Sequence, residues 1–124
     1  MFYFEQFPLL PRPQYFIDIY QLMIYDLNMS WKIEIPTKVG KKIKLLPKSV
    51  RATLFLLLRD LELNGPKPGE GWKNYSKLHG LPGDKRHCHL KKGKPTYVCC
   101  WEVVNKKLKI TEVYYVGTHE NAPY

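Results

Sequence analysis

The sequence predicts a small α+β domain in which two helices cover one face of a small antiparallel sheet. Apolar residues recur at helical spacing in the first half of the chain, whereas the second half alternates polar and apolar residues as strands do. Short turns join the later segments, which is typical of an antiparallel meander of three to four strands. At 124 residues, the chain is long enough to bury one core without disulfides or metals.

The N-terminal half of this domain is predicted to hold one strand and two helices. Residues 30–35 alternate apolar and charged side chains and predict a half-buried strand, which Pro36 ends. Thr37 is placed to cap a short helix, and Pro47 suits the first turn of a longer one. Asn64-Gly65-Pro66 ends the longer helix, since glycine and proline favour helix termination. The apolar stripe of this helix is the predicted core and consists of Val50, Leu54, Leu57, Leu58 and Leu61.

The C-terminal half is predicted to hold the meander, after a loop rich in glycine and proline. Its strands are expected at Arg86 to Lys91, Thr96 to Val104 and Lys107 to Val116. In the last strand, alternation predicts one face that carries Leu108, Ile110, Tyr114 and Val116. The other face would carry Thr111, Val113 and Tyr115. Because the helices precede the meander, they are expected to pack together on one face of the sheet.

The composition indicates a cytoplasmic protein with an anionic partner. The net charge of +9 and the pI near 9.5 favour nucleic acid or an acidic protein as the partner. No segment approaches the roughly 20 apolar residues of a membrane helix, and the N-terminus lacks the basic start of a secretory signal. Three cysteines, two of them adjacent, imply no disulfide framework; as small apolar fillers they suit a reducing cytoplasm.

Residues 1–28 differ in composition from the rest of the chain. They carry a net charge of −2. Because the whole chain carries +9, residues 29–124 carry +11. They also hold eight of the 17 aromatic residues and no lysine. One interpretation is an N-terminal helix over residues 14–26 that packs on the body. The other is an N-terminal extension that precedes a natural start at Met29, and both interpretations stay open.

Two histidines on one predicted strand are the first candidates for catalysis. Alternation places His87, His89 and Lys91 on one face and Cys88 and Leu90 on the other. Histidine is the side chain best suited to exchange protons near neutral pH. Lysines beside it can bind phosphate and neutralise charge that develops on phosphorus. This face therefore has the residue types that cleavage of RNA without a metal requires.

His119 follows the last predicted strand and can join the other histidines only if register and strand order bring it there. The simpler interpretation of each feature stays open. A single strand histidine is ordinarily a surface residue, turn lysines ordinarily protect sheet edges, and strand aromatics are ordinarily core residues. The histidines and cysteines of residues 87–100 would split across both faces without a Cys-x-x-Cys motif, which argues against a zinc site. We predict neither a metal nor another cofactor.

Three segments resemble the RelE/ParE toxin superfamily, and within it the YafQ-type messenger-RNA endonucleases of bacterial type II toxin–antitoxin systems. They are residues 72–78, residues 86–90 and the ending Tyr115-Val116-Gly117-Thr118-His119, of which Gly-Thr-His is the most specific part. The resemblance covers about residues 31–124 and leaves residues 1–28 without a counterpart. It therefore implies an N-terminal extension, residues 1–28, before a RelE/ParE-like toxin domain at residues 29–124.

This resemblance implies a ribosome-dependent, metal-independent endoribonuclease that cleaves messenger RNA and inhibits translation. Such toxins use the RNA 2′-hydroxyl as the nucleophile and are neutralised by a cognate antitoxin. His119 corresponds to the C-terminal catalytic histidine of the family, and His89 to the histidine of the middle strand. Tyr124 lies near the position of a terminal aromatic residue that contacts RNA, one residue further from the histidine.

Two departures from the YafQ pattern bear on the site. Where the family has an acidic residue after the middle-strand histidine, this chain has Lys91 and Lys92, so lysine is expected to take its place. An upstream histidine of the family is matched by His79 at a shifted spacing, and His87 is a second substitute. The predicted catalytic set is accordingly His119, His89 and His87. The predicted substrate-binding set is Arg86, Lys91, Lys92, His79 and Tyr124.

Two other functions are compatible with the same predicted fold. A ParE-like toxin would inhibit DNA gyrase without enzymatic activity and would need no histidine set. An inactive relative would bind only its antitoxin or RNA. The expected partners of the leading hypothesis are a cognate antitoxin, the ribosome and messenger RNA, with no membrane.

Overall fold

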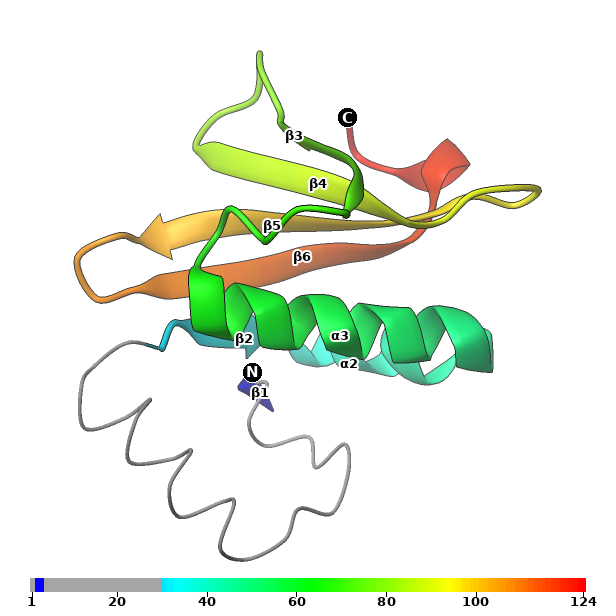
Figure 1. Ribbon diagram of the computed structural model, residues 1–124, viewed down its shortest axis with the longest axis horizontal. Coiled ribbons are helices and arrows are strands. Elements are labelled where there is room, and N and C mark those ends of the chain that lie inside the picture. The colour runs from blue at the N-terminus through cyan, green and yellow to red at the C-terminus, as the bar shows by residue number, and fades with distance from the viewer. Residues whose placement is uncertain (1, 4–29) are drawn as a thin grey trace, which may run out of the picture.

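The computed structural model describes residues 2–3 and 30–124 of the chain, and its helices and strands come in the order shown in Figure 1. The predicted helix over residues 14–26 and the predicted natural start at Met29 lie outside the described residues. The described elements are β1 (Phe2–Tyr3), β2 (Lys32–Ile35), α2 (Thr37–Lys44), α3 (Lys48–Asn64), β3 (Lys73–Lys77), β4 (Asp84–Lys91), β5 (Tyr97–Asn105), β6 (Ile110–Thr118) and the 3-10 turn η3 (His119–Asn121).

The strands form one sheet with the order β1-β2-β6-β5-β4-β3. The predicted α+β class is confirmed, and β4, β5 and β6 form the expected antiparallel meander. The sheet is larger than expected, since β3 extends one edge, and β2 pairs with β6 in parallel. A parallel pair needs a long crossover connection, and here the helices α2 and α3 and the strands β3, β4 and β5 supply it. The sheet is therefore mixed and not wholly antiparallel.

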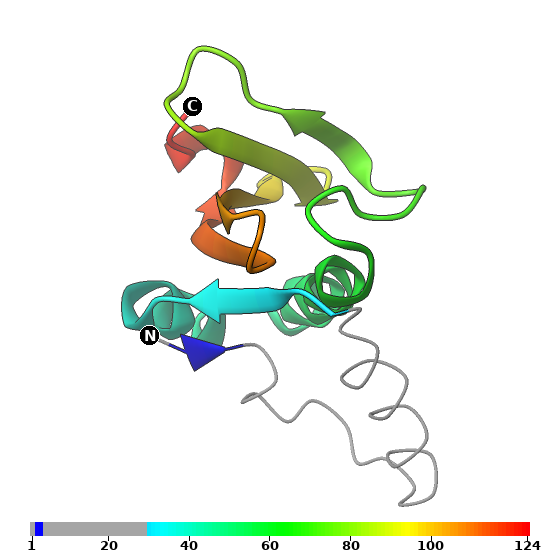
Figure 2. The ribbon, with the colours of Figure 1, turned by 90° about the vertical axis from the view of Figure 1, so that its left-hand side faces the viewer.

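Both helices lie on one face of the sheet, as the sequence predicts, and Figure 2 views them nearly end-on. The apolar stripe of α3 is fully buried against the strands, which confirms it as core. The sheet contributes Ile33 and Ile35 from β2, Trp101 from β5, and Val113 and Val116 from β6. Neither α2 nor α3 covers the opposite face of the sheet, and the functional residues described below lie there. No helix in the described part of the chain is long and apolar enough to cross a membrane.

The last strand does not keep the alternation that the sequence predicts. Thr111, Val113 and Val116 are all buried. In a regular strand, Val116 would face the side opposite to Thr111 and Val113, because it lies an odd number of residues from each of them. The cause is a register shift in the β5–β6 ladder, where Cys100 pairs with Tyr115 but Trp101 pairs with Val113. Tyr114 is the extra residue of this bulge, so the side chains after it change face. The predicted grouping of Val116 with Tyr114 is therefore wrong.

The three cysteines are free and buried, as expected of small apolar residues. Cys88 pairs with Cys99 across the β4–β5 ladder, and both belong to the core on the helix side. Burial raises the pKa of the Cys88 thiol to about 12, with a smaller contribution from Cys100. These thiols therefore stay protonated and serve packing.

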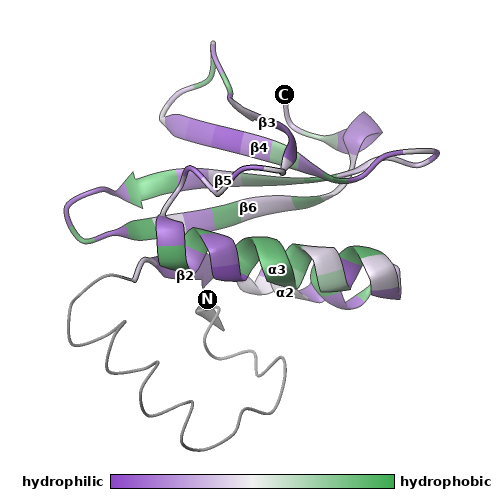
Figure 3. Cartoon of the chain, viewed as in Figure 1, coloured by the Kyte–Doolittle hydropathy of each residue, from purple (hydrophilic) through white to green (hydrophobic). Residues whose placement is uncertain are grey.

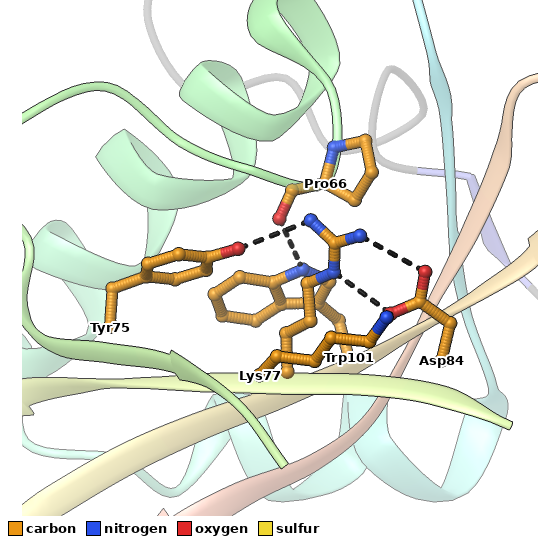
Figure 4. A network of polar contacts seen from close by, with 6 residues as sticks. Pro66, Tyr75, Lys77, Asp84 and Trp101 are labelled. Atoms are coloured by element: carbon orange, nitrogen blue, oxygen red, sulfur yellow. Dashed lines mark hydrogen bonds and ion pairs between the residues drawn. The ribbon is translucent and has the colours of Figure 1, made fainter. Parts of the chain in front are cut away.

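A polar network ties the loop after α3 to the meander (Figure 4). The fully buried Trp101 donates its indole N–H to the Pro66 carbonyl at 2.9 Å and stacks on Tyr75, with ring centroids 6.1 Å apart. Arg86 donates to both carboxylate oxygens of Asp84 at 3.0 Å and to the Tyr75 hydroxyl at 3.1 Å. The network thus joins β3, β4 and β5 on the helix side of the sheet.

The Arg86–Asp84 pair makes stability depend on pH in a defined direction. Hydrogen bonds from Arg86 lower the pKa of Asp84, against a smaller opposing effect of burial. A lowered folded-state pKa contributes stability above the unfolded-state pKa, and this stability is lost as the pH falls through the folded-state pKa. We expect Asp84→Asn to lower the free energy of unfolding by about 1 kcal/mol at neutral pH, because a charged hydrogen-bonded pair is lost at a partly exposed site.

Urea unfolding near neutral pH and again below the pKa of Asp84 measures this difference. The loss should shrink at the acidic pH, and Glu120→Gln, at an exposed carboxylate, is the control. An equal loss at both pH values would mean that the carboxylate charge does not matter.

Candidate functional site

The candidate site lies on the sheet face that the helices leave open, and β4 supplies its first two residues. Cys88 is completely buried and Leu90 is 8% exposed, both against the helices. Alternation therefore turns His87 and His89 to the other face. Figure 3 shows β4 as mostly hydrophilic, although β5 covers one of its edges and β3 the other. This polar strand, which lies next to the edge strand β3, is the base of the site.

Three histidines and one tyrosine come together on this face, and we call them the histidine–tyrosine cluster: His87, His89, His119 and Tyr124. The ring centroids of His87 and His89 lie 5.7 Å apart, and those of His89 and His119 lie 5.4 Å apart. Tyr124 closes the cluster at 4.7 Å from His87 and 5.8 Å from His119. The structure thus brings together the three predicted catalytic histidines and the predicted aromatic contact.

Strand pairing carries His119 to the cluster. In the meander, Val98 of β5 pairs with His89 on one side and with Gly117 on the other. The ladder continues one step beyond β6, because the backbone N–H of His119 donates to the Thr96 carbonyl at 2.8 Å. The turn η3 then reverses the chain, so that Tyr124 lies against His87 and His119.

Gly117 is required by the packing of a neighbouring tyrosine. The Tyr115 hydroxyl donates to the Thr118 carbonyl at 2.7 Å and thereby crosses over Gly117. A Cβ atom at position 117 would lie 2.6 Å from this hydroxyl oxygen, which is too close for any real contact. The glycine of the Gly-Thr-His ending therefore lets Tyr115 brace the backbone just before His119.

The two strand histidines are held in an environment that favours their neutral form. His87 is 8% exposed, and its Nδ1 shares a hydrogen bond with the Ser76 hydroxyl at 3.2 Å. Burial lowers the pKa of His87, the bond to Ser76 opposes this, and His119 lowers it further. Burial also lowers the pKa of His89, with further contributions from His87, His119 and Lys92. A neutral imidazole can accept a proton, as a general base must.

The outer part of the cluster differs from its base. His119 is exposed to solvent and can exchange its proton with water or with a bound ligand. Tyr124 is 44% exposed, and burial, followed by its neighbours Cys100, Tyr115 and Cys88, raises its pKa to about 12. Its phenol therefore stays protonated, so it can stack or donate a hydrogen bond but cannot act as a base.

Not all of the predicted substrate-binding residues lie at the cluster. Arg86 faces the helix side, because it is one residue from His87, and there it binds Asp84 and Tyr75. A register shift after His89 pairs Lys91 with Tyr97, whose ring packs against the core, so Lys91 does not continue the histidine row. His79 is exposed in the loop that precedes Asp84 and joins none of the ring contacts of the cluster. Arg86 and Lys91 are thus turned away from the histidine row, and a role of His79 at the site stays a prediction.

Lys92 lies near the cluster as predicted, since its charge acts on His89, and Tyr124 belongs to the cluster itself. Sequence reasoning missed two residues of β3, Ser76 and Lys73. Ser76 pairs with His87 and Lys73 pairs with His89 in the β3–β4 ladder. Their polar character was visible in the sequence, but the pairing of an edge strand leaves no local pattern.

Among the described residues, no three histidine, cysteine or acidic side chains are arranged to hold a metal ion.

Acidic residues and the histidine–tyrosine cluster occupy different parts of this sheet face. Glu34, Glu112 and Glu102 lie side by side across β2, β6 and β5, away from the histidines. Burial raises the pKa of Glu112, and repulsion from Glu34 and Glu102 raises it further. The acidic row occupies the end of the face near β2, while the cluster occupies the end near β3. The acidic row therefore disfavours an anionic ligand at the end of the face near β2.

The position of Gly117 makes a first prediction about the site. We expect Gly117→Ala to displace Tyr115 and lower the free energy of unfolding by about 1–3 kcal/mol, as overpacking does. Urea unfolding measures this loss. In a Tyr115→Ala background the same glycine substitution should cost less, because the clash is gone. Additive costs would show that Tyr115 is not the reason for the glycine.

The charge near His89 makes a second prediction. We expect His87 and His89 to titrate below the ordinary histidine pKa in an NMR titration of the ring protons. Lys92→Ala should raise the pKa of His89, because removal of a nearby positive charge favours the imidazolium. Lys107→Ala, at the exposed β5–β6 turn, should leave it unchanged. A pKa of His89 that does not respond to Lys92→Ala would contradict the geometry of the site.

Comparison with known proteins identifies the fold. No family model matches the chain, and no curated protein matches its sequence. Among solved structures, a free mutant of the Escherichia coli toxin RelE is 22% identical, with a TM-score of 0.50 over 72% of this chain and 83% of that one. The archaeal RelE–RelB complex from Pyrococcus horikoshii OT3 gives 26% identity and a TM-score of 0.53, over 76% of this chain and all of that one. The two helices, the mixed sheet and these neighbours together show that the chain has the fold of the RelE/ParE-like superfamily.

Proposed function

We propose that this protein is the toxin of a type II toxin–antitoxin system and a messenger-RNA endonuclease that acts on the ribosome in the cytoplasm. The observation that carries the proposal is the histidine–tyrosine cluster, which lies on the open face of a RelE-like sheet. The net charge of +11 on residues 29–124 suits a polyanionic substrate. Neutral imidazoles beside an exposed histidine suit acid–base cleavage of a phosphodiester without a metal.

The first step activates the RNA. His89, whose pKa is lowered by burial, accepts the proton of the ribose 2′-hydroxyl at the scissile nucleotide. The 2′-oxygen then attacks the adjacent phosphorus and forms a bond to it. Negative charge grows on the phosphoryl oxygens, where the Lys92 ammonium stabilises it. This is the role that lysine takes where YafQ-type relatives have an acidic residue.

The second part of the reaction expels the leaving group. The bond between phosphorus and the 5′-oxygen breaks, and the exposed His119 donates a proton to that oxygen. The products are a 2′,3′-cyclic phosphate and a free 5′-hydroxyl, and water returns the two histidines to their starting protonation states. The rings of His89 and His119 contact each other edge to face, with centroids 5.4 Å apart, so that one phosphate bound beside the pair is within reach of both imidazoles.

The remaining members of the cluster support these two. His87 is nearly buried and lies under Tyr124, so it acts on its neighbours and does not reach the RNA. With Ser76 it keeps the base of the site rigid, and in its neutral form it adds no charge that would oppose proton uptake by His89. The exposed part of the Tyr124 ring is available to stack on a base next to the scissile bond.

The proposed partners follow from the same surface. The archaeal neighbour was solved as a RelE–RelB complex, which supports a cognate antitoxin for this chain as well. An antitoxin with acidic segments would neutralise the cationic end of the sheet face and exclude RNA from it. Within the superfamily, the combination of His89 and His119 supports an activity of the YafQ type.

The role of His119 is tested by substitution. We expect His119→Ala to reduce RNA cleavage by about 10²–10⁴-fold, as loss of a general acid does, and to relieve growth arrest on induction. Primer extension on a messenger RNA in a cell-free translation system measures the cleavage. Glu120→Ala, at the neighbouring exposed position, is the matched control and should retain activity.

Undiminished cleavage by folded His119→Ala protein would remove the role given to this histidine. A gyrase supercoiling assay on the wild-type protein separates the alternative. Gyrase inhibition without RNA cleavage would replace the proposed function with that of a ParE-like toxin.

A further inference from the structure

The edge strand β3 brings a lysine to the histidine face. In the β3–β4 ladder, Lys73 pairs with His89 and Ser76 pairs with His87. Residues that lie directly opposite in an antiparallel pair project to the same face of the sheet. The hydrogen bond between Ser76 and His87 demonstrates this for the second pair, at 3.2 Å. Lys73 therefore projects to the face of the histidine–tyrosine cluster, beside His89.

A bulge is responsible for this direction. Regular alternation would put Lys73 on the same face as Tyr75, which stacks on Trp101 at the helix side. The ladder instead shifts register between Lys73 and Ser76, where three steps along β3 match two along β4. Asn74 takes up the difference with a φ of 56°, in the left-handed region that asparagine tolerates better than most residues. The bulge turns Lys73 over to the histidine face.

The Lys73 ammonium is available to a ligand. The residue is exposed, and its side chain forms no ion pair or hydrogen bond with any described residue. Lys77, at the other end of the same strand, is different. It pairs with Arg86 in the ladder and lies 3.8 Å from the Asp84 carboxylate, so it belongs to the helix-side network. One strand thus carries two lysines, of which only one faces the cluster.

The surroundings of Lys73 suit a phosphate. Opposite residues in an antiparallel pair have Cα atoms only about 5 Å apart, so the lysine side chain can reach a group bound at His89. β3 is the edge of the sheet at this end, and no described strand blocks the approach of an extended ligand. Lys92 approaches His89 as well, from the β4–β5 turn.

We propose that Lys73 binds a phosphate of the RNA backbone next to the scissile bond, so that the strand enters the site over the β3 edge. The proposal rests on the proposed RNA cleavage and deepens it, because it assigns a substrate contact to a residue that the predicted substrate-binding set does not include. Lys73 and Lys92 would hold consecutive phosphates around His89. Tyr124 would hold a base beyond His119, on the far side of the scissile phosphate.

Binding of a non-cleavable RNA tests the contact apart from the chemistry. The probe is a short single-stranded RNA with 2′-O-methyl groups throughout, titrated into the full-length protein at several salt concentrations. We expect Lys73→Ala to weaken binding about 5-fold to 10-fold and to reduce the slope of log Kd against log salt by about 0.7, the value for one phosphate contact on a single strand. Lys77→Ala removes the same charge from the same strand and should change the Kd less than about twofold. Lys73→Arg keeps the charge and should retain binding.

Equal weakening by Lys73→Ala and Lys77→Ala would overturn the proposal, because net charge alone would then explain the effect. Undiminished binding by folded Lys73→Ala protein, or failure of the wild type to bind the probe, would overturn it as well. Cleavage assays with ribosomes, run in parallel, keep the two proposals apart. Binding that depends on Lys73 without any cleavage by the wild type would refute the proposed function and support the phosphate contact. Cleavage and RNA binding that are both unchanged in Lys73→Ala would support the proposed function and refute the phosphate contact.

Discussion

The alternation of side chains along β4 is the constraint on which the rest of this structure depends. Cys88 and Leu90 are held in the core, so His87 and His89 are forced onto the open face. A slip of one residue would bury two imidazoles and expose the apolar pair, at a large cost in free energy. The neighbouring strands fix the register from both sides, and the helix-side contacts of Arg86 and Trp101 hold the start of β4 in place.

Departures from regular pairing then assemble the site. The bulge at Tyr114 changes the face of every later residue in β6, which puts Val116 into the core and lets the Gly117 backbone pass under Tyr115. The bulge at Asn74 turns Lys73 toward His89. A third register shift, after His89, removes Lys91 from the histidine row. Bulges often re-aim side chains near functional sites, and here each of the three decides which residues share the open face.

The chemistry of the site comes from the contrast between its base and its rim. His87 and His89 are partly desolvated and lie close to one another, and both effects favour neutral imidazoles. His119 and the lysines at the rim remain exposed, where water and a bound anion can reach them. A site with a neutral acceptor inside and exchangeable protons outside can move protons in both directions across a phosphate. The acidic row of Glu34, Glu112 and Glu102 leaves the other end of the same face unfavourable for an anion.

The sequence by itself determined the two helices, the meander, the core stripe of α3 and the shared face of the His87 and His89 rings, because periodicity and residue type are local properties. Tertiary structure alone decided which residues stand next to those rings. Arg86 faces the helix side because it is one residue from His87. Lys73 and Ser76 lie on the histidine face because the edge strand β3 pairs with β4 through a bulge. The parallel pairing of β2 with β6 was equally invisible, since it joins segments that are far apart in the chain. Register and strand order are set by packing between distant segments, and no local pattern in the sequence records them.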